Sequence, residues 1–142
     1  EHAGLRKFHE QRSGEEVHIP NELRPIVGRA ILEYFKSINI RVAAIAVGKV
    51  HAHVLTELLD DYAKVREVVG HAKRKSSRAI KQWLPGSVWS SGGTYEEVND
   101  RKHLDATHDY LLYEQGAGAW TWSYKDGSME GRFGRRKVKK TK

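Results

Sequence analysis

The chain has 142 residues, which is enough for one domain of about 100–200 residues. A hydrophobic fraction of 39% with four Trp supports a core, and the absence of cysteine excludes disulfide scaffolds, thiolate zinc sites and cysteine catalysis. No apolar run approaches the ~18 residues of a membrane span, so we expect a cytoplasmic protein without a membrane partner.

The formal net charge of +7 is unevenly distributed. Seven of the 25 basic residues lie between positions 132 and 142, so the rest of the chain carries 18 basic residues against 18 acidic ones. A second basic cluster, between Lys64 and Lys81, contains only one acidic residue, Glu67. Two separated clusters favour a nucleic-acid partner, although a solvated helix face and a disordered tail would look the same. The expected phosphate-binding residues are Lys64, Lys73, Arg74, Lys75, Arg78, Arg135, Arg136 and Lys137.

The first half of the chain predicts a helix followed by a hairpin. Apolar residues at spacings of three and four predict an amphipathic helix from Glu22 to about Ser37, after a short strand at 17–19. Residues 41–47 read as a buried strand, and residues 51–58 alternate as a second strand after the turn at Gly48. The two strands should pair in an antiparallel hairpin.

The second half predicts two more helices and further strands. Asp60 and Asp61 open a helix whose apolar stripe continues to Trp83, and Asp100 opens a helix that runs to about Gln115. Residues 88–90 and 119–124 read as strands. The predicted fold is α+β, with helices packed on an antiparallel sheet. We divide the chain into an N-terminal segment at 1–16, a domain at 17–126 and a basic, disordered tail at 127–142.

The sharpest local motif is His51-Ala52-His53. Residues two apart on a strand point to the same face, so two imidazoles would stand side by side and hold one divalent metal ion. The plainer reading is two ordinary surface histidines. Candidates for a third ligand lie on the last helix, at His103, His108, Asp109, Glu114 and Gln115.

The last helix also carries two tyrosines, Tyr110 and Tyr113. Tyr110 and Glu114 are four residues apart and share a helical face, so a phenol and a carboxylate could reach one metal site together. Tyrosine is a recognised covalent nucleophile, and a phosphotyrosine link to DNA conserves the phosphodiester energy. The alternative is that Tyr110 simply packs, as most half-buried tyrosines do.

Three blocks, in order, resemble a known family: residues 40–55 with the two histidines, residues 76–89 from Ser76 to Trp89, and residues 109–112 around Tyr110. From about Pro20 to Gln115 the chain is similar to the single-tyrosine HUH transposases of insertion sequences, which include the REP-associated tyrosine transposases of bacteria. The family has a strand before its first helix, and only residues 17–19 are available for it here.

The resemblance implies a ferredoxin-like HUH endonuclease fold and an enzyme that nicks single-stranded or hairpin DNA, forms a 5′-phosphotyrosine link and rejoins strands. It implies His51 and His53 as metal ligands and Tyr110 as the nucleophile. Glu114 stands where the family often has a Gln or another ligand, and its oxygens suit Mg²⁺ or Mn²⁺. The resemblance also allows a homodimer, and it places the chain with DNA in a bacterial cytoplasm.

Two other functions remain open on the sequence. The first is a nucleic-acid-binding module that keeps the fold without the chemistry, with basic residues holding phosphates and aromatic residues stacking bases. The second is a zinc-dependent hydrolase that uses His51, His53 and a carboxylate. The position of Tyr110 relative to the two histidines is the observation that best discriminates among the nicking enzyme and these two alternatives.

Overall fold

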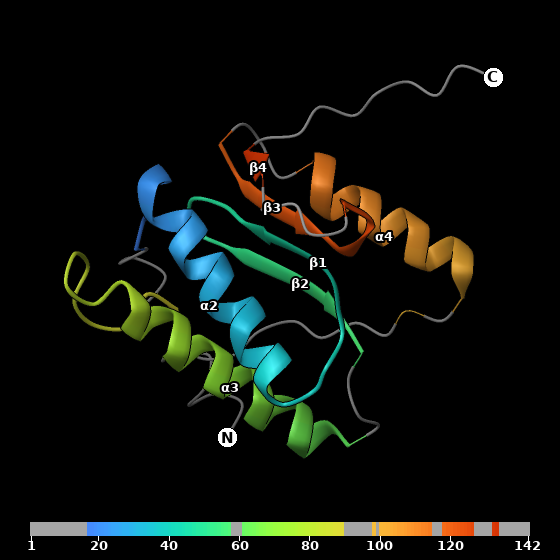
Figure 1. Cartoon of the computed structure of the whole chain (residues 1–142), viewed down its shortest axis with the longest axis horizontal. Coiled ribbons are helices and arrows are strands. Elements are labelled where there is room, and N and C mark those ends of the chain that lie inside the picture. The colour runs from blue at the N-terminus through green and yellow to red at the C-terminus, as the bar shows by residue number, and fades with distance from the viewer. Residues whose placement is uncertain are drawn as a thin grey trace, which may run out of the picture.

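The protein combines an antiparallel sheet with helices on both of its faces (Figure 1). The computed structural model describes residues 17–57, 61–89, 98, 100–114, 118–126 and 132–133. The described helices are α2 (Arg24–Ser37), α3 (Tyr62–Ala79) and α4 (Arg101–Tyr113), with short 3₁₀ turns η1 (Asn21–Leu23) and η2 (Tyr124–Asp126). The described strands are β1 (Val42–Val47), β2 (Ala52–Thr56), β3 (Trp120–Ser123) and β4 (Arg132–Phe133). The predicted α+β class is confirmed.

The strands lie in the order β2-β1-β3-β4, and every described pair is antiparallel. β1 and β2 form the predicted hairpin, which closes where the Gly48 amide donates to the His51 carbonyl at 2.8 Å. β3 comes from the far end of the chain and pairs with the other side of β1. β1 is therefore an interior strand with a neighbour on each side, which agrees with its run of Val, Ile and Ala.

The two faces of the sheet bury different residues. On one face α2 and α3 cover a cluster that includes Ile45, Val47 and Trp120. On the other face α4 packs Leu111 and Leu112 against small β1 residues and Leu55. Figure 1 shows this arrangement, with the strands lying between the α2–α3 pair and α4. The alanines of β1 on the second face leave room for α4 to approach closely.

The helix starts follow from local chemistry. The Asp61 carboxylate accepts hydrogen bonds from the amides of Ala63 and Lys64, and the Asp100 carboxylate accepts one from the amide of His103. Both are N-cap interactions, which satisfy amides that the first helical turn leaves unpaired. Asn39, just past the predicted end of the first long helix at about Ser37, has a φ of 65°, a left-handed conformation that Asn tolerates better than most residues.

Four details differ from the sequence predictions. Residues 17–19 form no strand, and the Ile19 amide instead donates to the Lys49 carbonyl in the hairpin loop. The third helix ends at Ala79 rather than continuing to Trp83, because the chain turns after the C-cap at Ile80. Residues 88 and 89 form no strand, and residue 90 lies outside the described residues. Within the expected basic tail, β4 pairs with β3. None of the described helices is long and apolar enough to cross a membrane.

Candidate active site

The two histidines of the His-x-His motif lie at the edge of the sheet. His51 immediately precedes β2, and His53 is the second residue of that strand. His53 pairs in register with Ala46 of β1, which in turn pairs with Thr121 of β3. Because paired residues share a face, His53 points to the side of the sheet that α4 covers.

Tyr110 comes to the same place from α4. Leu111 and Leu112 fix the buried side of this helix against the sheet, and Tyr110 is left 49% exposed at its margin. The Tyr110 ring meets the His53 ring edge-on, with 6.3 Å between centroids and an interplanar angle of 84°. Tyr113, by contrast, packs against the cluster that α4 forms with the sheet.

His51, His53 and Tyr110 therefore form a row of rings, which we call the His–Tyr site. The His51 and His53 rings lie 6.3 Å apart between centroids, with an interplanar angle of 48°. Partial burial, and secondarily the neighbouring His51, lower the pKa of His53 from its ordinary value of 6.5. A lowered pKa keeps this imidazole neutral at neutral pH, which is the form that binds metal ions.

Glu114, the predicted third ligand, does not join this row. Its amide donates to the Tyr110 carbonyl at 3.1 Å, so it sits one turn after Tyr110, but α4 has ended and the Glu114 side chain is exposed. Among the described residues no three His, Cys, Asp or Glu side chains gather into a group fit for a metal ion. Two imidazoles on one face still fit a divalent ion whose other ligands are water or phosphate oxygens. The role of Glu114 stays a prediction.

We expect Mn²⁺ to bind through this histidine pair. The double variant His51→Ala/His53→Ala should weaken Mn²⁺ binding at least about tenfold in a calorimetric titration, because it removes both imidazole ligands. His71→Ala is the matched control, since His71 is exposed on α3 and its Nδ1 lies 3.0 Å from Arg74 Nη2. Equal Mn²⁺ affinity in the wild type and the double variant would rule out this metal site.

His108, a candidate third ligand by sequence, serves a different contact. It is 4% exposed, and its Nε2 lies 2.8 Å from Ser123 Oγ on β3, which also accepts a hydrogen bond from the Lys125 amide. The Tyr124 ring stands edge-on to His108 at 6.1 Å between centroids. This polar contact links α4 to β3 and holds the helix that carries Tyr110.

Sequence reasoning missed Ser123. The available signal was the strict alternation of residues 120–123, which places Thr121 and Ser123 together on the face opposite Trp120. Polar residues on the inward face of a strand need partners, and a buried helix residue such as His108 is one.

Ser123→Ala should lower the free energy of unfolding by about 1–3 kcal/mol, because the substitution leaves His108 Nε2 buried without this hydroxyl. Urea unfolding followed by far-UV circular dichroism measures the change. Ser37→Ala is the control, since its exposed hydroxyl donates to the Tyr34 carbonyl at the end of α2. A Ser123→Ala value as small as that of the control would show that the His108–Ser123 contact contributes little.

The predicted phosphate-binding residues of α3 do not share one face. At about 100° per residue Lys64, Arg74, Lys75 and Arg78 fall on one side of the helix, whereas Lys73 lies about 160° around the helix from Lys75. Lys73 is half-buried, and this burial lowers the pKa of its amine. Lys73 is therefore separated from the rest of the predicted set. Arg135, Arg136 and Lys137 lie outside the described residues.

The block from Ser76 to Trp89, one of the three that resemble the family, makes hydrogen bonds that hold the local structure together. The Trp89 Nε1–H donates to the buried Ser76 hydroxyl at 2.9 Å, and that hydroxyl donates to the Lys73 carbonyl. The neighbouring Ser77 hydroxyl donates to the Gly86 carbonyl. These bonds fasten the chain after α3 back onto the helix, and none of them reaches the His–Tyr site.

Comparisons of the chain with protein-family models, with curated proteins and with solved structures found no match. A functional assignment therefore depends on the local motifs and on the geometry of the His–Tyr site.

Proposed function

We propose that this protein is a metal-dependent enzyme that nicks and rejoins single-stranded DNA through a tyrosine. The observation that carries the proposal is the contact between the Tyr110 ring and His53, which brings together a half-exposed phenol and two imidazoles from distant parts of the sequence. The motif order that resembles the HUH transposases points to the same chemistry. We propose that this reaction takes place in the cytoplasm and serves DNA transposition or a host function derived from it.

The reaction is an exchange of phosphodiesters. The Tyr110 Oη attacks a backbone phosphorus, the bond to the 3′ oxygen breaks, and the downstream strand stays on the enzyme, joined through its 5′ phosphate as a phosphotyrosine. The phenol proton is lost as the new bond forms, and the departing 3′ oxygen gains a proton. Attack by a free 3′ hydroxyl on the phosphotyrosine reverses these events and rejoins a strand. No energy source is needed, because one phosphodiester replaces another.

The residues around Tyr110 suit this role. A phenol with an ordinary pKa near 10 is a weak nucleophile at neutral pH, so it needs a cationic neighbour to favour the phenolate. A divalent ion held by His51 and His53 would supply that charge and neutralise a phosphate oxygen. Tyr110 is exposed enough to meet a DNA strand, and its helix is held by the buried Leu111, Leu112 and His108.

A second candidate is a nucleic-acid-binding module without chemistry. The basic residues on the outer side of α3 favour it, since they bind phosphates whether or not Tyr110 reacts. The two candidates differ in one measurable product, a covalent protein–DNA adduct.

The test incubates the full chain with 5′- and 3′-labelled single-stranded oligonucleotides and Mn²⁺, then separates the products on a denaturing gel. The oligonucleotides are drawn from the DNA that flanks the gene. We expect the fragment that carries the 3′ label to be linked to the protein through its 5′ phosphate, and the 5′-labelled fragment to be released with a free 3′ hydroxyl, both abolished by EDTA. Nucleic-acid binding without any adduct would favour the module over the enzyme.

A further inference from the structure

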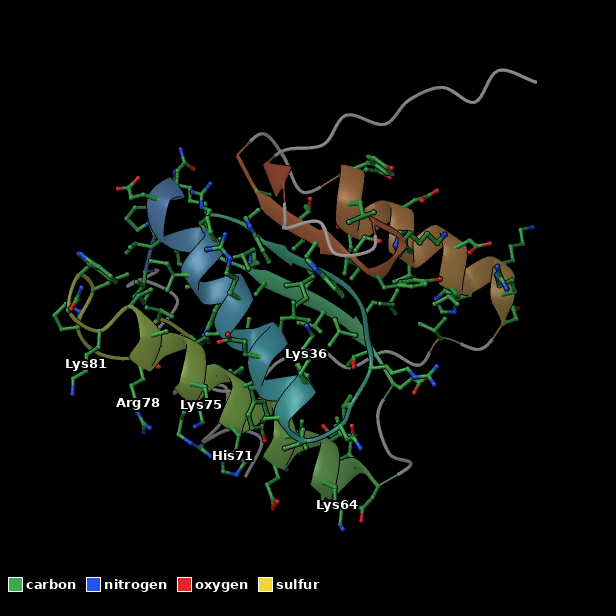
Figure 2. The ribbon with its side chains drawn as sticks, in the orientation of Figure 1. Lys36, Lys64, His71, Lys75, Arg78 and Lys81 are labelled. Carbon is green, nitrogen blue, oxygen red and sulfur yellow. The ribbon has the colours of Figure 1, made fainter. Side chains whose placement is uncertain are left out.

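The side of α3 that faces away from α2 carries a line of basic side chains. We call it the outer stripe and define it by Lys64, Arg74, Lys75 and Arg78, together with Lys81 in the turn that follows the helix. Figure 2 shows Lys64, Lys75, Arg78 and Lys81 projecting along this outer side, with His71 among them. Glu67 is the one acidic residue in this part of the sequence.

The outer stripe is open to an external anion. No described carboxylate forms an ion pair with its basic groups, and Arg74 Nη2 lies against His71 Nδ1 at 3.0 Å. From Lys64 to Arg78 the stripe extends about 21 Å at 1.5 Å per residue. That length suits several consecutive phosphates of a nucleic-acid strand.

An exposed aromatic residue stands at the end of the stripe. Trp83 is 53% exposed, although its position on the apolar periodicity predicted burial. The helix ends at Ala79, and the chain turns so that the amides of Trp83 and Leu84 both donate to the Ile80 carbonyl, at 3.0 and 2.9 Å. Ile80 is fully buried, so the turn that carries Lys81 and Trp83 is anchored to the core.

We propose that the outer stripe and Trp83 form a binding site for single-stranded nucleic acid, in which the basic side chains hold phosphates and the indole stacks on a base. An indole platform selects single strands, because the bases of a duplex are already stacked on one another. The anchored turn fixes the backbone that carries the indole, so little backbone freedom is lost when a base stacks.

This site is separate from the His–Tyr site. α3 lies with α2 on one face of the sheet, and α4 with Tyr110 covers the other (Figure 1). The stretch of nucleic acid that binds the outer stripe is therefore different from the stretch that meets Tyr110. The inference deepens the nucleic-acid part of the proposed function, and it does not depend on tyrosine chemistry.

The test measures binding in the Tyr110→Phe background with EDTA present, so that no nicking takes place. The probes are a fluorescein-labelled 12-nucleotide oligo(dT), a 12-base-pair duplex and a labelled poly-glutamate peptide, each followed by fluorescence anisotropy at one fixed salt concentration. We expect Trp83→Ala to weaken oligo(dT) binding on the order of tenfold and to leave duplex binding unchanged. Trp83→Phe should retain most of the affinity, because it keeps an aromatic face.

Tyr62→Ala is the matched control. Tyr62 is 61% exposed at the other end of α3, but it lies off the outer stripe, and the Arg66 guanidinium covers its ring at 5.9 Å. Its loss should not change oligo(dT) affinity. The proposal is overturned if Trp83→Ala matches the Tyr62→Ala control, if it weakens duplex binding equally, or if the acidic peptide binds more tightly than oligo(dT). Because these measurements exclude catalysis, their failure would leave the nicking reaction standing, and the absence of an adduct would leave this site standing.

Discussion

Tyr110→Phe is expected to abolish the covalent protein–DNA adduct, whereas Tyr113→Phe should leave it in place. The substitution removes only the phenolic oxygen, which is the atom that attacks phosphorus. The phenyl ring keeps its edge contact with His53, and the residue is 49% exposed, so stability should change by less than about 0.5 kcal/mol. Loss of the adduct would then report chemistry rather than unfolding. The measurement is the protein-linked fraction of a labelled oligonucleotide on a denaturing gel with Mn²⁺.

Tyr113 is the matched control because it lies on the same helix, three residues away. It packs against the cluster that contains Leu111, Leu112 and the β1 alanines, and within the described residues its ring does not contact the histidine pair. An adduct that survives Tyr110→Phe and disappears in Tyr113→Phe would reverse the assignment. An adduct that survives both substitutions would exclude tyrosine chemistry from α4.

The elements that the sequence predicted well are those whose signals are local. The capping carboxylates of Asp61 and Asp100 and the left-handed Asn39 each act within a few residues, so the sequence placed these boundaries within about three residues. The same holds for the hairpin, because its strands are adjacent in sequence and joined by a short loop.

Features that depend on contacts between residues far apart in the sequence were harder to predict. Residues 17–19 have the composition of a strand, but β3 occupies the second edge of β1, and the amide of Ile19 pairs with the hairpin loop instead. Trp83 fits the apolar periodicity of α3, yet the helix ends at Ala79 and the turn at Ile80 directs the indole outward. Periodicity alone cannot show where a helix stops.

The candidate site divides in the same way. Two histidines at i and i+2 on a strand share a face by geometry, so their pairing follows from the sequence. The approach of Tyr110 depends on how α4 crosses the sheet, which is set by the small Ala44 and Ala46 and by the His108–Ser123 contact. The face that Tyr110 shares with Glu114 and the resemblance to a family pointed to that approach, whereas the position of Glu114 beyond the end of α4 had no sequence signal.

Gly28→Ala should be among the most destabilising single-methyl changes in the domain. Gly28 lies in α2 directly beneath the Trp120 ring of β3, and a Cβ there would stand 2.0 Å from Cζ3, 2.2 Å from Cε3 and 2.8 Å from Cη2. Trp120 is 1% exposed and packed on every side, so the ring cannot move aside without displacing the core. Overpacking of this kind costs about 1–3 kcal/mol, and this contact is severe enough to reach about 3 kcal/mol despite Ala's better helix propensity. Urea unfolding measures the loss.

Gly70→Ala on α3 is the control for the same chemical change. Its Cβ would find the Arg74 guanidinium at 3.5 Å, an ordinary contact, so the better helix propensity should stabilise the protein by about 0.5–1 kcal/mol. If Gly28→Ala also stabilised the protein, the inference that α2 packs closely on the Trp120 ring would be wrong. A double-mutant cycle then isolates the cause: Trp120→Phe should cost less in the Gly28→Ala background than in the wild type, because the smaller ring makes room for the new methyl group. Strictly additive losses would show that Gly28 acts through its backbone instead of through the space it leaves for the indole.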